Sequence, residues 1–501
     1  MSKKVEEVTE QKPEKVLTKY DLKMQKRAEE KARAKKEKLV SNITTIVVVL
    51  AVAALVLSFP IRSYLAVNGA YINVGGEKVT KVEFDYQYNL TKNNYIAQYG
   101  YYMSMFGMDF SGDLSAQQYS EDLSWQDYFE QLTVESIKKN RALYADAKAA
   151  GFTYDTSDDY KQFLEDVKSE AKEYGVTEKV VLQDNYGEMA TISRLKKYVL
   201  KDLEIAAYYE KIAEDKMPAD AEVTQYYVEN ATNYDSIDYV QTVVTAVLPT
   251  EPTDLAEEGA EVKEGETYVP SEAEVEFAMK EAKGKADAAL KNIDKDGEVK
   301  ENIKGSAMTN VVREWLFAAE RKAGDTAVLE NTSGRSYYVV KFNKRYLDET
   351  VSKDARIIIA DPALAQAYLN EWKSGAATEE SFAEIADQYN NEDVTAAKGG
   401  LYEGLLATSV PEGMDTWLYE EGRKKGDTTV IAPEGDEFAY VVYFVGDNDP
   451  EWKLSVKSTL QSDAVNTYIN DLIAGYSVSD PKGHLNYLKV QASKAAESDE
   501  E

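Results

Sequence analysis

The sequence contains no cysteine and a single histidine, His484. The absence of thiols excludes disulfides, thiolate metal sites, cysteine nucleophiles and a lipid-modified cysteine at a membrane. One histidine leaves almost no material for a Ser-His-Asp triad or for a zinc site. His484 itself lies in the segment PKGHLNYL, where we expect a residue of a surface turn. The sequence therefore predicts neither a metal nor another cofactor.

Positive charge is scarce after the first 38 residues. The whole chain has a formal net charge of −31, whereas residues 1–38 carry 13 basic and 8 acidic side chains, which leaves −36 for the rest. Nucleic-acid binding needs a basic surface, so this composition argues against a nucleic-acid partner. The acidity is typical of a soluble exported domain, and an acidic binding face is the alternative.

The chain has one long uncharged run. Residues 39–61 read LVSNITTIVVVLAVAALVLSFPI, between Lys38 and Arg62. About 20 such residues are enough to cross a bilayer. A cleaved signal peptide is a competing interpretation, but its apolar region is shorter, about 7 to 15 residues. A buried core helix is a third interpretation. We expect an uncleaved transmembrane helix.

Lysine and arginine are concentrated directly before this run, in the segment MQKRAEEKARAKKEK (residues 24–38). The positive-inside rule then makes residues 1–38 a basic cytoplasmic tail and places everything after Arg62 outside the membrane. We therefore expect a single-pass protein of the cell membrane, with its bulk extracytoplasmic.

Two segments of the chain are nearly the same. Residues 315–342 read WLFAAERKAGDTAVLENTSGRSYYVVKF, and residues 417–444 read WLYEEGRKKGDTTVIAPEGDEFAYVVYF. Twelve of the 28 positions are identical without a gap, at a constant offset of 102. An internal duplication explains this agreement, and its period is the size of a small domain. We therefore predict two tandem modules.

The patterns around the duplication predict an α+β fold class. Strand-like, β-branched runs open and close each module, and stretches with helical spacing lie between them. With 501 residues, 44% of them hydrophobic, the chain can bury several cores. The predicted parts are a tail (1–38), a transmembrane helix (39–61), a mainly helical domain (66–235), module one (236–348) with an acidic insertion (251–272), module two (351–447), a C-terminal helical segment (452–490) and an acidic tail (491–501).

Several segments of the sequence resemble a known protein family. The segment GGEKVTKVEFDYQYN resembles the N-terminal chaperone domain of membrane-anchored, extracytoplasmic foldases of the PrsA and SurA type. The modules resemble parvulin domains, whose pattern matches SFAEIADQYNNEDVTAAKGGLYEG, RKKGDTTV and YVVYFVG in module two. The resemblance covers about residues 66 to 476 and is clearer for module two than for module one. It implies a chaperone of unfolded exported polypeptides in a Gram-positive-type envelope.

The resemblance also implies peptidyl-prolyl isomerase modules, with one departure. Parvulin isomerases typically carry histidines on the first and last core strands, and neither module has one there. Rotation about an X-Pro bond needs no nucleophile, so a pocket that desolvates and twists the bond could still lower the barrier of about 20 kcal/mol. By family match, the candidates for a proline pocket are Leu405, Leu406, Val410, Met414 and Trp417. Ordinary core residues of the module would show the same residue types, so the sequence does not distinguish a pocket from a core.

A second candidate surface is the segment YGYYMSMFGMDF (residues 99–110). Methionine and aromatic side chains interrupted by glycine are typical of adaptable apolar surfaces that hold varied partners. The candidates for client binding are Tyr101, Tyr102, Met103, Met105, Phe106 and Met108. A packed loop of the helical domain is the interpretation that the sequence favours more.

Two functions remain open. The first is a foldase that binds unfolded polypeptides as they are exported, with parvulin-type isomerase activity if the modules are active. The second is a non-catalytic envelope scaffold or adaptor with one fixed protein partner, and the missing histidines motivate it.

Overall fold

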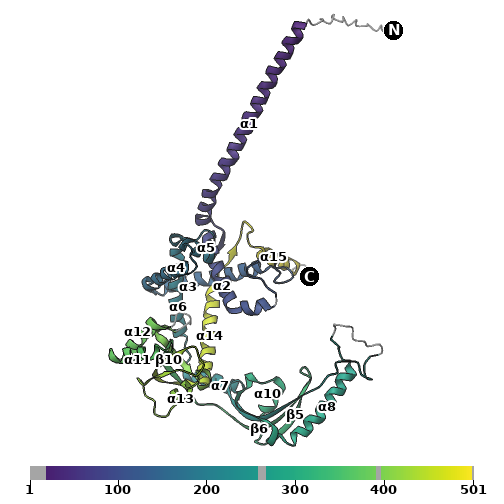
Figure 1. The fold of residues 1–501 in the computed structure, drawn as a ribbon, viewed down its shortest axis with the longest axis vertical. Coiled ribbons are helices and arrows are strands. Elements are labelled where there is room, and N and C mark those ends of the chain that lie inside the picture. Colours follow the sequence, from purple (N-terminus) through teal and green to yellow (C-terminus); the bar gives the residue numbers. More distant parts are fainter. Residues whose placement is uncertain (1–18, 106, 258–266, 391–396, 499–501) are drawn as a thin grey trace. The chain divides into compact units, whose positions relative to one another are not determined.

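A computed structural model describes residues 19–105, 107–257, 267–390 and 397–498 (Figure 1). The chain divides into two compact units. The helical unit comprises the residues up to 212 together with those from 467 onward, and the sheet unit comprises residues 213–466. Helices and three small sheets are both present, which confirms the α+β class. Parts of the predicted tail, acidic insertion and acidic tail lie outside the described residues.

A single long helix, α1 (Lys19–Asn68), contains the apolar run. Within it, Ile43–Asn68 reaches a mean hydropathy of 2.5 and is long and apolar enough to cross a membrane. None of this apolar window is buried inside the protein, so a buried core helix is not what the structure shows. By length and composition the helix fits a membrane anchor, and a signal sequence would pass the same test.

The helical unit combines several helices with a three-stranded sheet. Its helices include α2 (Lys81–Met105), α3 (Trp125–Ala149), α4 (Ser157–Glu173), α5 (Glu178–Tyr186), α6 (Ile192–Asp215) and α15 (Asn486–Ser498). Helix α14 (Glu451–Ile473) runs from the sheet unit into this unit. The sheet has the order β11-β1-β2, with antiparallel strands β1 (Ile72–Val74), β2 (Glu77–Val79) and β11 (Val478–Ser479).

Local sequence explains the β1–β2 hairpin and the start of α2. Gly75 and Gly76 form the hairpin turn with φ of +60° and +81°, which glycine adopts without strain. The hydroxyl of Thr80 then accepts a hydrogen bond from the backbone N–H of Glu83 at 3.2 Å and so caps α2. Both features follow from local residue types, namely a glycine pair in the turn and a threonine before the first turn of the helix.

Helix α2 lies between two apolar clusters. Val82 belongs to a cluster with buried side chains of α4, α5 and α6. Phe84 belongs to another cluster with the hairpin, α3 and the start of α15. Because α2 supplies buried residues to both, it is the central helix of the unit.

The sheet unit contains two four-stranded antiparallel sheets with the same strand order. The first has the order β4-β3-β6-β5, with β3 (Ser236–Thr245), β4 (Glu298–Lys304), β5 (Thr326–Asn331) and β6 (Ser336–Tyr346). The second has the order β8-β7-β10-β9, with β7 (Val351–Ala360), β8 (Leu401–Leu405), β9 (Thr428–Ile431) and β10 (Ala439–Pro450). Each strand of the first sheet thus has a counterpart in the second.

The helices of the sheet unit follow the same division. The first sheet is accompanied by α8 (Glu272–Leu290), α9 (Ile293–Asp296) and α10 (Asn310–Leu316), and the second by α11 (Ala365–Ser374), α12 (Glu379–Tyr389) and α13 (Met414–Leu418). Helix α7 (Asp220–Tyr234) precedes both sheets. Figure 1 shows α8 running along the sheet that contains β5 and β6.

The residues shared by the two repeated segments make the same contacts in both sheets. The guanidinium of Arg321 lies over the ring of Trp315, 3.8 Å from the ring centroid, and Arg423 lies over Trp417 at 3.9 Å. Each arginine also donates from Nε to the backbone carbonyl of its tryptophan, at 3.1 Å and 2.9 Å. This stacking fixes the turn that follows the short helix.

The shared Gly-Asp pairs lead into the sheets. The backbone N–H of Gly324 donates to the carbonyl of Phe342 at 2.8 Å, and that of Gly426 donates to Phe444 at 3.0 Å. The two glycines have φ of +90° and +93°, a conformation that a side chain disfavours. The glycines conserved between the two segments therefore hold the turn against β6 in the first sheet and against β10 in the second.

Candidate functional site

The C-terminal end of α2 carries an uncovered apolar surface. Tyr101 is 75% exposed, Tyr102 64% and Met105 69%, and we call these three side chains the α2 surface. Met103 and Met108 are half-buried. Phe106 lies outside the described residues. The packed-loop interpretation is therefore wrong for these three side chains, because they belong to a helix and are exposed.

A helix cap fixes where the α2 surface ends. The backbone N–H of Gly107 donates to the carbonyl of Ser104 at 3.0 Å, and that of Met108 donates to Met103 at 3.3 Å. Gly107 has φ of +83°. This pair of bonds with a left-handed glycine is the Schellman ending of a helix.

An aromatic cluster holds the last turns of α2 against α3. The ring of Tyr95 lies 5.3 Å from that of Phe129 in an edge-on arrangement, and Tyr119 stacks on Tyr128 at 4.0 Å. Trp125 packs against several of these rings. These ring contacts place α2 against α3 at Tyr95, about two turns before the α2 surface begins.

A cavity of about 440 Å³ lies along the preceding turns of α2, between this helix, α3 and α6. Its lining is Gln87, Leu90, Thr91, Asn94, Ser136, Lys139, Asn140, Leu143, Asp202, Ile205, Ala206, Tyr209 and Glu210. Tyr101 and Met105 follow Asn94 by seven and eleven residues, which are close to two and three helical turns. They therefore continue the face of α2 that lines the cavity, starting about 10 Å farther along the helix.

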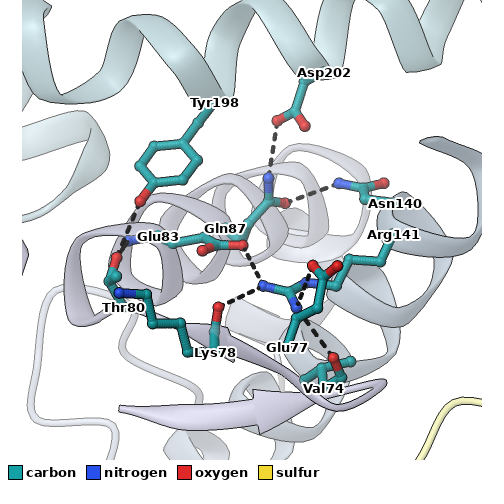
Figure 2. A network of polar contacts seen from close by, with 10 residues as sticks. All are labelled: Val74, Glu77, Lys78, Thr80, Glu83, Gln87, Asn140, Arg141, Tyr198 and Asp202. Atoms are coloured by element: carbon teal, nitrogen blue, oxygen red, sulfur yellow. Dashed lines mark hydrogen bonds and ion pairs between the residues drawn. The ribbon is translucent and has the colours of Figure 1, made fainter. Parts of the chain in front are cut away.

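A buried polar network lies beside this cavity (Figure 2). Gln87 on α2 donates to the carboxylate of Asp202 on α6 at 2.9 Å and accepts from Asn140 on α3 at 3.3 Å. The hydroxyls of Thr80 and Tyr198 share a hydrogen bond of 3.0 Å. These bonds join three helices and hold the walls of the cavity in register.

Arg141 on α3 forms the other half of the network (Figure 2). Its guanidinium donates to the carbonyls of Val74 and Lys78 in the hairpin, at 3.0 Å and 2.9 Å. It also pairs with Glu83 at 3.0 Å and Glu77 at 3.3 Å. The sheet, α2 and α3 are thus fastened through one buried side chain.

Two ionisable side chains of the cavity are perturbed. Burial raises the pKa of Asp202 to about 6, although hydrogen bonds from Gln87 and Tyr86 act in the opposite direction. Burial lowers the pKa of Lys139, whose ammonium lies 4.8 Å from the ring centroid of Tyr209. The cavity therefore holds a carboxylate that changes its charge at mildly acidic pH.

The proline-pocket candidates lie in and around one apolar cluster of the second sheet. Met414 is only 1% exposed, and the half-buried Leu405, Val410 and Trp417 pack against the same cluster. Leu406 is half-buried at the start of the turn after β8 and is not part of this cluster. Met414 therefore serves as a core residue in this structure, and Trp417 is covered by its stacked arginine.

The described residues offer little material for acid–base or metal chemistry. They contain no group of three histidine, cysteine or carboxylate side chains arranged to hold a metal ion. His484 is exposed in the turn before α15, and its ring stacks on Tyr71 at 4.3 Å. The position expected for the histidine is confirmed, and it lies in the helical unit.

The sequence reasoning missed the cavity along α2. Its signal was present, because Gln87, Asn94 and Tyr101 recur at intervals of seven residues on one helix. A polar and aromatic face of this kind also occurs on helices that are simply solvated. Only the packing of α3 and α6 turns the first part of this face into a cavity wall.

No protein-family model and no curated protein match the chain. Among solved structures, it is similar to the foldase protein PrsA from Streptococcus pneumoniae, with 13% identity, 55% of this chain and 86% of that chain covered, and a TM-score of 0.17. It is also similar to PrsA from Bacillus subtilis, with 17% identity, 56% of this chain and 88% of that chain covered, and a TM-score of 0.12. A further match is a chain from the structures of the SurA-like chaperones PEB4 and Cj1289 from Campylobacter jejuni. Its identity is 16%, 54% of this chain and 80% of that chain are covered, and the TM-score is 0.12. At these identities and TM-scores the similarities carry no argument, and the function is argued from the residues.

Proposed function

We propose that this protein is a membrane-anchored, extracytoplasmic folding factor that binds unfolded, exported polypeptides on the α2 surface. The exposure of Tyr101, Tyr102 and Met105 at the end of α2 is the observation that carries the proposal. Unbranched methionine adapts to many shapes, and tyrosine offers a large apolar face with little loss of entropy. Such a surface suits partners that share apolar character and have no common sequence.

The membrane anchor and its orientation belong to the same proposal. Helix α1 supplies a stretch long and apolar enough to span a bilayer, and the basic segment 24–38 precedes it. The positive-inside rule then leaves the helical and sheet units on the outer face, in a Gram-positive-type envelope. The strong negative charge of this part favours solubility at a surface crowded with unfolded chains.

The two repeated sheets complete the proposal as parvulin-like modules with little or no isomerase activity. Their sequence pattern resembles parvulins, but β3, β6, β7 and β10 carry no histidine. The burial of Met414 also leaves this candidate as a core residue without access to a substrate. Binding without chemistry is therefore the working mechanism.

Aggregation of a denatured client tests the proposal. The full-length chain in lipid nanodiscs should suppress this aggregation, and replacement of Tyr101, Tyr102 and Met105 together by serine should remove most of the effect. Tyr174→Ser is the matched control, because Tyr174 is exposed at the end of α4 in the same unit. Equal suppression by the triple variant and the wild type would contradict the proposal.

The scaffold alternative rests on the missing histidines and makes a different prediction. A photo-crosslinking amino acid at position 102 should capture many newly exported chains if the protein is a folding factor. A single stoichiometric partner would instead show a scaffold.

A further inference from the structure

A second cavity, of about 310 Å³, lies in the sheet unit between α8 and the segment that leads to it from β3. Its apolar walls include Val247, Leu248 and Leu255 from this segment, and Phe277 from α8. Glu281 and Lys285 also line it. The volume lies at the lower end of the range for ligand-binding cavities, about 300 to 1,000 Å³.

The cavity depends on a segment that the second sheet does not have. In the first sheet, β3 ends at Thr245 and α8 begins at Glu272. At the corresponding place in the second sheet, β7 ends at Ala360 and α11 begins at Ala365. The two sheets share one strand order, so the long connection is an addition to a common plan. Because the β3–α8 connection builds this cavity and the second sheet has no such connection, a binding role of the cavity would be specific to the first sheet.

Glu274 fastens the added segment to α8. Its carboxylate accepts hydrogen bonds from the backbone N–H and the hydroxyl of Thr253, at 2.9 Å and 2.6 Å. The hydroxyl of Tyr268 and the backbone N–H of Ser271 donate to its other oxygen, at 2.5 Å and 2.9 Å. Burial alone would raise the pKa of Glu274, but these hydrogen bonds bring it down to about 2. The carboxylate is therefore ionised at any physiological pH, and the wall is held in place without a ligand.

The cavity has an exposed apolar rim and lies in an acidic part of the chain. Phe277 is 54% exposed, and Val247 and Leu255 are exposed as well. Glu281 and Lys285 are charged lining residues, and residues 246–257 and 267–290, from which the walls are built, contain eight carboxylates and three lysines in all. Because apolar side chains continue beyond the cavity itself, its occupant should extend past one buried group. Because the surrounding charge is negative, the occupant should be basic next to its apolar part.

We propose that this cavity binds one large apolar side chain of an extended peptide that carries lysine or arginine beside it. The apolar side chain enters between α8 and the added segment, and the neighbouring basic groups face Glu281 and the carboxylates of the surrounding acidic segments. The inference rests on the proposed function in one respect, namely that such peptides are segments of unfolded clients. The cavity would then be a client subsite separate from the α2 surface.

The test uses the full-length chain in lipid nanodiscs and two fluorescent 12-residue peptides. Both contain one phenylalanine in a polar background, flanked by lysines in one peptide and by glutamates in the other. By fluorescence anisotropy, the lysine peptide should bind at least about tenfold more tightly at low salt, and added salt should reduce the difference. Phe277→Ser should weaken its binding by about tenfold. Val299→Ser, which changes an exposed apolar residue of β4 outside the cavity, should leave binding unchanged.

The outcomes separate this inference from the proposed function. Equal affinity for the two peptides, or unchanged binding by a Phe277→Ser variant with a wild-type circular dichroism spectrum, would overturn the cavity as a peptide site. If the triple serine variant of the α2 surface still suppresses aggregation while Phe277→Ser loses peptide binding, the proposed function fails and the cavity stands. If the triple serine variant loses suppression of aggregation while Phe277→Ser still binds the lysine peptide, the proposed function stands and the cavity fails as a peptide site.

Discussion

Single residues decide how firmly the helical unit holds its cavity. Arg141 places four of its N–H groups on the hairpin carbonyls and on Glu77 and Glu83, while its Nε is buried without a hydrogen-bond partner among the described residues. Asp202 is half-buried at the other side of the same network, where it lines the cavity and accepts a hydrogen bond from Gln87. A buried charge with fixed partners is costly to disturb, since loss of one partner leaves the other unpaired.

Arg141→Lys should therefore destabilise the protein by about 2 to 3 kcal/mol, because an ammonium cannot reproduce the planar set of donors. The free energy of unfolding can be measured by urea titration in detergent micelles. Lys161→Met is the control, since its pair with Glu165 is exposed and should contribute less than about 0.5 kcal/mol. A stability loss for Arg141→Lys as small as that of the control would show that the network does not hold the unit together.

Asp202 makes stability depend on pH. Its pKa is about 6 in the folded protein, above the value of about 3.9 for an unfolded chain. The folded state then binds more protons between these values, so stability falls as pH rises through about 4 to 6. Asp202→Asn should remove up to about 3 kcal/mol of this loss. Urea titrations at pH 4.5 and 7.5 compare the two proteins, and an identical pH dependence in both would refute the assignment.

At the scale of elements, α2 shows what the sequence can and cannot predict. The start of the helix depends on neighbouring letters, so Thr80 and the Gly75–Gly76 turn could be identified in advance. The exposure of Tyr101 and Met105 depends on whether a distant segment covers them, and helical spacing is the same in both cases. The strands of the repeat could be identified because they depend on local sequence. The two cavities were missed because they depend on the packing of distant segments.

The proline-pocket candidates illustrate the same limit at α13. A family match places Met414 in sequence, but β7 and β10 bury it, and they come from distant parts of the chain. Met414→Ala should therefore destabilise the second sheet by about 2 to 4 kcal/mol. Hydrogen–deuterium exchange of β7 and β10 measures this effect. Leu406→Ala is the control and should change exchange little, since Leu406 is outside the cluster. Unchanged exchange in the Met414 variant would restore this residue as a binding-site candidate.

At the scale of the whole molecule, the proposed client binding can be tested separately from isomerase activity. Uncatalysed prolyl isomerisation takes about 10 to 100 seconds, so catalysis by the full-length chain would be visible in the refolding of a proline-limited substrate. We expect less than a twofold change in that rate, because no histidine orders a polar network on the core strands. An acceleration of several-fold that is lost in Trp417→Ala would show that the second sheet is an active isomerase.

The affinity of the full-length chain for one permanently unfolded client tests the central claim most directly. Anisotropy of the labelled client should give a dissociation constant that rises by at least about tenfold when Tyr101, Tyr102 and Met105 are all serine, because three large exposed faces are lost. Tyr174→Ser should bind like the wild type. A triple variant that binds the client as tightly as the wild type would contradict the account.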